Sequence, residues 1–160
     1  MDGYTKRWRA LGSLGAYTRS NKRWLRNPNQ DMSKIKGMRL LGIDYGETHI
    51  GFAFKPEDSK LAVPHQIFDR KPGDREALID EVKDIVDELE VEMVIVGLPL
   101  TLQGKPDKMC DRVALFIHDL RKNISVRVDQ EDERMTTRMA GKHAHDLSAA
   151  IILQTYIDTN

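Results

Sequence analysis

The stretch that most constrains the fold is VEMVIVGLPL, residues 91–100, a nearly continuous run of apolar side chains. A strand that is apolar on both faces is typical of a sheet that helices cover on both sides. An amphipathic helix is predicted before it, within residues 73–90 with Asp74 as N-cap, and another after it, around residues 113–120. Because helices alternate with strands here, the neighbouring strands should pair in parallel.

Shorter apolar stretches supply the rest of a sheet. Four further strands are expected, at residues 38–46, 49–56, 60–68 and 124–128. The first two form a hairpin in which Gly46 is expected to have a positive φ, and Pro64 indicates an edge strand. A last helix is expected to begin at Asp146. The predicted fold class is α/β, a mixed five-stranded sheet with three antiparallel strands followed by parallel strands, flanked by helices.

The net charge of the chain is zero, but the charge is unevenly distributed. Residues 1–37 contain 9 basic and 2 acidic residues, whereas the remaining residues contain 16 basic and 23 acidic ones. We expect residues 1–37 to be a mostly disordered basic extension and residues 38–160 to be the folded domain. The extension is consistent with a solvated tail, an organellar transit peptide or an RNA-binding arm, in which Trp8, Tyr17 and Trp24 could stack on bases.

The single cysteine and the lack of long apolar runs limit the cellular environments that suit the chain. Cys110 alone can form neither an intramolecular disulfide nor a zinc site built from several cysteines, and a reducing compartment fits. No stretch approaches the roughly 20 consecutive apolar residues of a membrane helix, so no membrane span is expected. A cytoplasmic location is the default, with a mitochondrion or plastid as the alternative if the extension is a transit peptide.

Acidic residues stand where predicted strands end and where the last helix begins. Asp44 ends the first strand, Asp132 and Glu133 follow the last strand, and Asp146 opens the final helix. In an open α/β sheet, binding sites form outside the carboxyl ends of the strands. Clustered carboxylates there suit Mg²⁺ or Mn²⁺, and two such ions can promote phosphodiester hydrolysis. Each acid also has a simpler interpretation, since Asp44 suits a turn, Asp146 an N-cap, and residues 130–137 a solvated loop.

Four motifs are spread over residues 39–157. They are GIDYGETHIGFA, VIVGLPLTLQG, DERMTTRMA and DLSAAIILQTYI. In sequence and in order they resemble the YqgF family, Holliday junction resolvase-like proteins that are named as nucleases of pre-16S rRNA. The resemblance covers nearly the whole predicted domain, and the combination is specific although the Asp-x-Gly element alone is weak.

The resemblance implies an RNase H-like fold and a metal-dependent endonuclease with Mg²⁺ or Mn²⁺ as cofactor. By matching position, it implies that Asp44, Glu133 and Asp146 are the catalytic residues and metal ligands, with Asp132 as an alternative ligand or outer-shell partner. The implied substrate-binding residues are Arg134, Thr136, Thr137, Gly97, Pro99 and Gly104. The implied partners are RNA, at the 5′ end of precursor 16S-type rRNA, and ribosomal precursor particles.

Three stretches depart from the family pattern. Residues 47–49 stand where the family usually has basic residues after the first Asp-x-Gly, residues 101–104 differ from the usual loop, and the segment before Asp146 is shorter. One alternative is therefore a catalytically silent RNA- or ribosome-binding module. A nuclease for branched DNA of the Holliday junction kind is another, and it would need a dimer. The rRNA nuclease could be a monomer or a homodimer.

Histidines add a second set of ionisable side chains. His143 and His145 stand next to Asp146 and could serve as a base, a metal ligand or a phosphate contact. A solvated loop is the simpler interpretation of both. His49, His65 and His118 are expected to be structural.

Overall fold

The computed structural model describes residues 32–99, 108–132 and 144–160. All the described residues belong to one compact unit, residues 32–160. The elements of this unit, in chain order, are η2 (Met32–Gly37), β1 (Leu40–Tyr45), β2 (His49–Lys55), β3 (Val63–Asp69), α2 (Arg75–Glu88), β4 (Met93–Leu98), α3 (Lys108–Asn123), β5 (Arg127–Asp132) and α4 (Ala144–Thr159).

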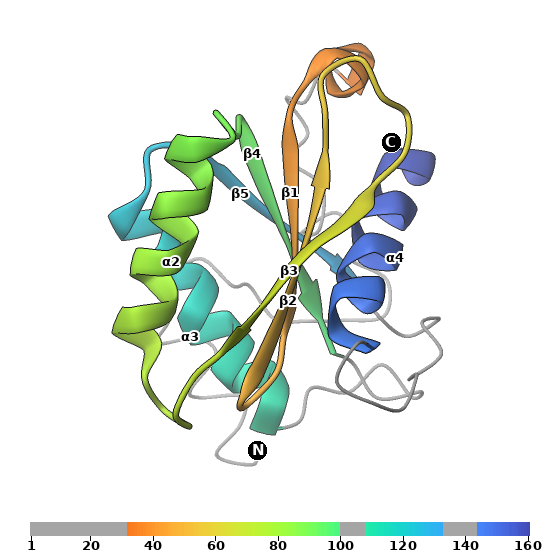
Figure 1. The fold of residues 1–160 in the computed structure, drawn as a ribbon. Coiled ribbons are helices and arrows are strands. Elements are labelled where there is room, and N and C mark those ends of the chain that lie inside the picture. Colours follow the sequence, from red (N-terminus) through yellow and green to blue (C-terminus); the bar gives the residue numbers. More distant parts are fainter. Residues whose placement is uncertain (1–31, 100–107, 133–143) are drawn as a thin grey trace, which may run out of the picture. The chain divides into compact units, whose positions relative to one another are not determined.

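The strands form one mixed sheet with the order β3-β2-β1-β4-β5 (Figure 1). β2 runs antiparallel to β1 and to β3, whereas β4 runs parallel to both β1 and β5. This arrangement confirms the predicted fold class. The apolar run that suggested a central strand is β4, in which all six residues are buried. Pro64 lies in β3 at the edge of the sheet, as its missing N–H group predicted.

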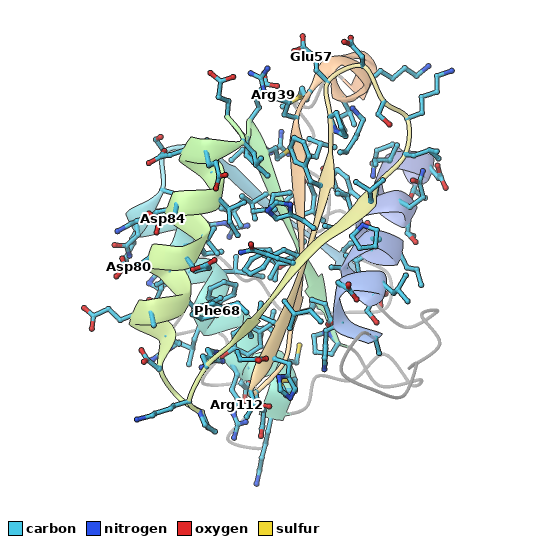
Figure 2. The ribbon with its side chains drawn as sticks, in the orientation of Figure 1. Arg39, Glu57, Phe68, Asp80, Asp84 and Arg112 are labelled. Carbon is cyan, nitrogen blue, oxygen red and sulfur yellow. The ribbon has the colours of Figure 1, made fainter. Side chains whose placement is uncertain are left out.

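Helices cover both faces of the sheet, with α4 on one face and α2 and α3 on the other (Figure 1). α2 begins after Asp74, whose side chain accepts a hydrogen bond from the Ala77 N–H, as expected of an N-cap. The outer surface of α2 is charged, and Figure 2 shows Asp80 and Asp84 directed away from the sheet. No helix among the described residues is long and apolar enough to cross a membrane.

The β1–β2 hairpin places glycine at two points of close approach. Gly46 was predicted to have a positive φ, and this is wrong, because Gly73 is the only described glycine with a positive φ. Gly46 is needed instead for space, since a Cβ there would overlap the carbonyl oxygen of His49. Gly42 on β1 has the same role, because a Cβ there would lie 2.7 Å from the Cβ of Leu153 on α4.

Three predicted boundaries shift in the structure. Residues 32–37 were assigned to the extension, but they form η2 and bring Ile35 into a buried apolar cluster with α4. β5 begins at Arg127 and runs to Asp132, so it lies further along the chain than the predicted strand at residues 124–128. Asp146 lies in the first turn of α4 rather than at its N-cap. Local patterns fix such ends poorly because packing decides them.

Candidate active site

Asp44 is the penultimate residue of β1, near the middle of the sheet. Only 14 % of its side chain is exposed. Side chains alternate along a strand, so Asp44 shares with Gly42 the face that α4 covers. A carboxylate in such a position needs a hydrogen-bond donor or a cation to offset its lost hydration.

His145, in the first turn of α4, supplies such a partner. Its Nδ1 lies 2.9 Å from Oδ2 of Asp44, and about a third of the His145 side chain is exposed. The expectation of a solvated loop for His145 is therefore wrong. The histidine stands 101 positions from Asp44 in the sequence. Its distance in the sequence explains why no local pattern connected the two residues.

Gly51 explains how α4 reaches the end of β1. It is the cross-strand partner of Asp44 on β2. A Cβ at Gly51 would overlap the carbonyl oxygen of His145 and lie 2.7 Å from the backbone nitrogen of Asp146. The start of α4 thus rests directly on the sheet beside Asp44. Two of the three predicted ligand positions, Asp44 and Asp146, are brought together in this way.

β5 supplies acidic residues to the same end of the sheet. Gly97 of β4 pairs with Glu131, and Leu98 pairs with Asp132. Asp132 was expected to follow the strand, but it is the last residue of β5. Asp129 faces α4, because the Tyr156 hydroxyl donates to its Oδ2 at 2.8 Å. Alternation then places Glu131 on the face of Asp44 and Asp132 on the opposite face.

Gly97 has a clear position in this arrangement. One residue beyond the β1–β4 pair Ile43–Val96, it lies level with Asp44 and separates β1 from Glu131. Two strand spacings of about 4.8 Å put the backbones of Asp44 and Glu131 roughly 10 Å apart. Gly97 is buried and places no side chain of its own between the two acids. Pro99 follows β4 directly. Sequence reasoning did not single out Glu131.

Several predicted site residues lie outside the described residues. They are Glu133, Arg134, Thr136, Thr137 and Gly104, together with His143. Within the described parts of the chain, no three His, Cys, Asp or Glu side chains gather closely enough to hold a metal ion. The predicted ligand set therefore depends on Glu133 for completion.

The described donors fit the chemistry of a hard divalent cation. Mg²⁺ and Mn²⁺ prefer carboxylate oxygens, which Asp44 and Asp146 supply. An outer-shell hydrogen bond that orients a ligating carboxylate is a usual feature of metal sites, and His145 makes such a bond to Asp44. Asp132 fits less well as a direct ligand beside Asp44, since it faces the other side of the sheet.

A second histidine lies close to this site. His49, the first residue of β2, has its ring centroid 5.9 Å from that of His145. Nδ1 of His49 lies 2.6 Å from Oδ1 of Asp69 on β3. His49 was expected to be structural, and this pairing ties β2 to β3. Both histidine–carboxylate contacts can be recognised only in the folded structure, because neither histidine stands in a sequence motif with its carboxylate partner.

The fold and the strand-end carboxylate define the class of protein. A structure of Thermus thermophilus RuvC aligns with this chain with a TM-score of 0.54 and 13% sequence identity. The alignment covers 76% of this chain and 95% of the RuvC chain. At this identity the similarity shows the fold alone, which is RNase H-like. The family model described as RuvX, Holliday junction resolvase, matches residues 38–159. The chain belongs to this family of nucleases, and the resemblance to YqgF proteins is confirmed.

Curated relatives agree with this assignment. A protein of Mycoplasmopsis synoviae named "Putative pre-16S rRNA nuclease" is 32% identical over 135 residues, which cover 76% of this chain and 98% of the relative. A protein of Anaplasma marginale with the same name is 33% identical over 134 residues, covering 75% of this chain and 84% of the relative. The similarity thus extends over almost the full length of the first of these relatives.

Proposed function

We propose that this chain is a metal-dependent endonuclease that hydrolyses phosphodiester bonds at the 5′ end of precursor 16S-type rRNA. The observation that carries the proposal is the meeting of Asp44 with the start of α4, where His145 and Asp146 lie. The names of the curated relatives support an RNA substrate.

Asp44, Asp146 and Glu133 would hold one or two Mg²⁺ or Mn²⁺ ions. Once bound, the ions would stabilise negative charge on the phosphate and on the leaving oxygen. His145 would act as a positioning residue, because its contact with Oδ2 fixes the orientation of the Asp44 carboxylate. Asp132 would have an outer role, since its side chain faces away from Asp44. Arg134, Thr136, Thr137 and Gly104 are proposed to contact the RNA, together with Gly97 and Pro99 at the end of β4.

A second candidate is the cleavage of branched DNA. The description of the family as Holliday junction resolvases favours it. Resolution of a four-way junction needs two active sites, so this function would require a homodimer. The catalytically silent binding module remains the third possibility, because the chain departs from the family pattern beside Asp44 and before Asp146.

A cleavage assay separates these possibilities. Purified protein would be incubated with a structured precursor rRNA fragment or a four-way DNA junction, in Mg²⁺, Mn²⁺ or EDTA. We expect metal-dependent cutting of the RNA. Asp44→Asn should lower the rate by about 100-fold or more, since the ligand carboxylate supports several kcal/mol of charge stabilisation.

Asp80→Asn is a matched control, because it makes the same change on the outer face of α2, where 68% of the side chain is exposed. It should cleave like the wild type. Preferential cutting of the DNA junction would favour the resolvase, whereas RNA binding with no cutting in any metal would favour the silent module. Equal activity of Asp44→Asn and wild type would refute the assignment of the active site.

A further inference from the structure

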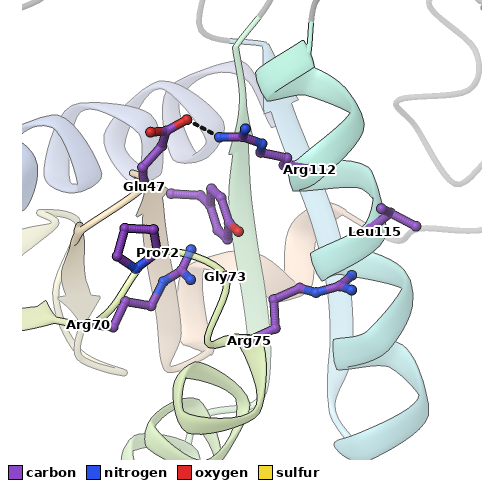
Figure 3. A pocket seen from close by; sticks show the side chains of 8 residues that line it. Glu47, Arg70, Pro72, Gly73, Arg75, Arg112 and Leu115 are labelled. Atoms are coloured by element: carbon purple, nitrogen blue, oxygen red, sulfur yellow. Dashed lines mark hydrogen bonds and ion pairs between the residues drawn. The ribbon is translucent and has the colours of Figure 1, made fainter.

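A pocket of about 440 Å³ opens on the face of the sheet that α2 and α3 cover. Its lining includes Tyr45 from the end of β1, Glu47 from the hairpin turn and three arginines, Arg70, Arg75 and Arg112 (Figure 3). Three guanidinium groups against one carboxylate give the lining a positive charge. The volume lies within the range of about 300–1,000 Å³ that is usual for small-ligand sites.

Two of the three arginines are paired with carboxylates. Arg112 of α3 forms an ion pair with Glu47, which Figure 3 draws as a dashed line across the pocket. Arg75, the first residue of α2, lies 3.1 Å from Oδ2 of Asp119. Arg75 and Arg112 therefore have carboxylate partners, although both still line the pocket.

Arg70 has no such partner. Its Nε and Nη1 atoms are buried without any hydrogen bond, and Nη2 is 3.4 Å from the carbonyl oxygen of Gly46, at the limit of a hydrogen bond. The guanidinium carbon lies 5.0 Å from the centre of the Tyr45 ring, a cation–π contact that holds the group beside β1. A guanidinium group has five N–H donors, and the three on Nε and Nη1 of Arg70 lack an acceptor. A buried donor without an acceptor is costly, so this group is poised for an anion.

The pocket lies next to the candidate active site along β1. Asp44 faces α4, whereas Tyr45, the next residue, faces α3 and packs against Phe116 with ring centroids 5.1 Å apart. The same strand end therefore presents the carboxylate on one face and the arginine pocket on the other. A polyanion that crosses this end of the sheet could reach both.

We propose that this pocket binds a phosphate group of the nucleic acid next to the scissile one, with Arg70 as its principal contact. A modest rotation of the guanidinium group would turn its fork toward the pocket, where it suits the oxygens of a phosphate. The pocket would then supply the positive charge that the hairpin turn lacks, since Glu47 and Thr48 are not basic and His49 is paired with Asp69. The proposal rests on the proposed nuclease function and adds a residue that fixes the position of the substrate strand.

Phosphate binding is tested first, in a way that does not require activity. Inorganic phosphate would be titrated into the full chain, and the side-chain Nε–H signals of the arginines followed by NMR. We expect saturable shifts at Arg70 and at the Tyr45 ring, with the Arg39 signal unchanged. Arg39 is a suitable reference because it lies at the opposite end of the sheet from Arg112 (Figure 2). No shift at Arg70 up to tens of millimolar phosphate would overturn the proposal.

Nucleic-acid binding is tested second, with fluorescence anisotropy on the precursor rRNA fragment in an Asp44→Asn background. Arg70→Gln should weaken binding by about tenfold and reduce the salt-dependence slope by about one. Arg70→Lys should restore part of the affinity, because it keeps the charge but not the fork. Arg39→Gln removes the same charge elsewhere and should bind within twofold of the background. Thermal unfolding of each variant would verify the fold.

The outcomes distinguish the subsite from the proposed function. Phosphate binding at Arg70 in a protein that cuts no nucleic acid would refute the nuclease and retain the anion pocket. If Arg70→Gln cuts RNA and changes neither the RNA affinity, nor its salt slope, nor the KM of cleavage, the subsite is refuted and the nuclease is retained. A mononucleotide that binds at least 100-fold more tightly than inorganic phosphate, with RNA binding unchanged in Arg70→Gln, would identify a free nucleotide as the ligand and overturn the strand proposal.

Discussion

Asp44 and His145 show how two residues define the chemistry at the end of β1. The carboxylate is mostly buried, and the imidazole contacts one of its two oxygens. Such a contact fixes which way the carboxylate points and so limits where a cation can approach. The histidine also closes the surface above Gly46, since a Cβ there would lie 3.3 Å from its Cε1.

Substitution of His145 should impair the site without removing it. We expect His145→Ala to lower cleavage, and the affinity for Mn²⁺, by roughly 10- to 100-fold, because Asp44 loses its orienting contact. His145→Asn should recover part of the loss, because its amide N–H can replace Nδ1. Metal titrations of the cleavage rate would measure both effects, with His65→Gln on the exposed part of β3 as control. A tighter Mn²⁺ affinity in His145→Ala would show that the histidine competes with the metal instead.

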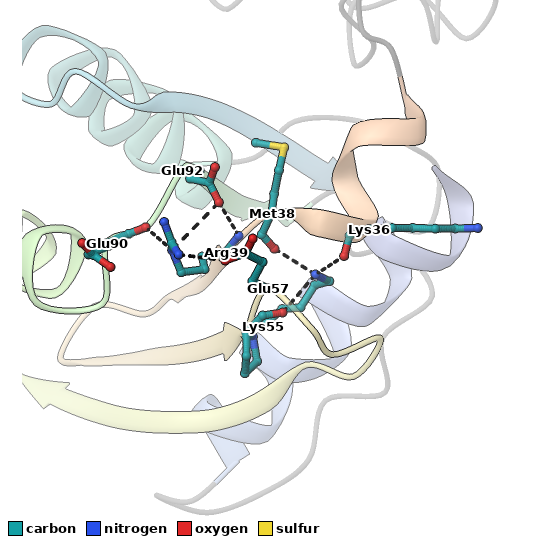
Figure 4. Close-up of polar contacts among 8 residues, drawn as sticks. Lys36, Met38, Arg39, Lys55, Glu57, Glu90 and Glu92 are labelled. Carbon is teal, nitrogen blue, oxygen red and sulfur yellow. Dashed lines mark hydrogen bonds and ion pairs between the residues drawn. The ribbon is translucent and has the colours of Figure 1, made fainter.

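Lys55 is the clearest case of a buried charge. Its side chain is fully buried, and Nζ donates to the carbonyl oxygens of Lys36, Met38 and Pro56 at 3.1, 2.8 and 3.1 Å (Figure 4). Burial lowers the pKa of Lys55 from its usual 10.5, although the nearby Glu92 and two other acids oppose this shift. The ammonium group thus joins the end of η2 to β2.

Replacement by an apolar residue should expose this role. Lys55→Met leaves buried carbonyl oxygens without a donor and should lower the free energy of unfolding by about 1–3 kcal/mol. Between the lowered pKa and 10.5, the unfolded wild type binds more protons than the folded one, so its stability gains with rising pH. The difference between wild type and Lys55→Met should therefore grow over that window and stay constant below it. Urea unfolding at a series of pH values measures the difference, and a decrease toward pH 10.5 would contradict the assignment.

At the scale of elements, glycines determine how closely α4 packs on the sheet. Gly42 and Gly51 lie under α4 on neighbouring strands, and a Cβ at either position would collide with it. Contacts of this kind bring backbone against backbone, so no side-chain rotation can relieve a clash. The position of α4, and with it His145 and Asp146, depends on the absence of these side chains.

Gly51→Ala should separate α4 from β2. The added methyl group overlaps backbone atoms of His145, so we expect a loss of about 1–3 kcal/mol in stability, as for other overpacked sites. Cleavage should fall with it because the contact between Asp44 and His145 is lost. Gly37→Ala is the matched control, since a Cβ there meets nothing within 4 Å. It should change stability by no more than about 0.5 kcal/mol. Thermal unfolding and cleavage of both variants test this, and equal behaviour would argue against close packing at Gly51.

At the scale of the whole domain, one end of the sheet carries the candidate active site on one face and the proposed phosphate pocket on the other. Its parallel strands β1, β4 and β5 end together, which is where binding sites form in open α/β sheets. α4 brings His145 and Asp146 to one face, and α2 and α3 bring the arginine pocket to the other. The large apolar cluster that includes Ile35, Leu40 and Tyr156 contains none of the candidate metal ligands.

Metal binding should therefore stabilise the domain without being needed for folding. A ligand present at 100 times its Kd adds about 2.7 kcal/mol if it binds only the folded state. For a domain of this size, saturating Mn²⁺ should raise Tm by on the order of 10 °C, whereas EDTA should leave a folded protein. Asp44→Asn should abolish the increase. Calorimetry with and without Mn²⁺ tests this, and an equal shift in wild type and Asp44→Asn would place the metal elsewhere.

The order and type of the strands and α-helices, and the family, could be predicted from the sequence alone. Apolar periodicity and capping are local patterns, so the buried strand β4 and the Asp74 N-cap could be predicted from the sequence. The position of Asp44 near the end of β1 was readable for the same reason. The exact ends of β5 and α4 were not, because they depend on contacts between segments that are distant in the sequence.

Which residues contact Asp44 could not be predicted from the sequence, because it depends on the packing of the fold. His145 reaches it across 101 positions because Gly51 lets α4 rest on the sheet, a packing event that no local pattern encodes. The register of β5 decided that Glu131 and not Asp132 shares the face of Asp44, since a shift of one residue exchanges the faces. The position of the Arg70 guanidinium group, whose Nε and Nη1 lack a hydrogen bond, likewise follows from the approach of the segment before α2 to Tyr45. Such contacts arise from the whole fold, because each joins segments that only the packed sheet and helices bring together.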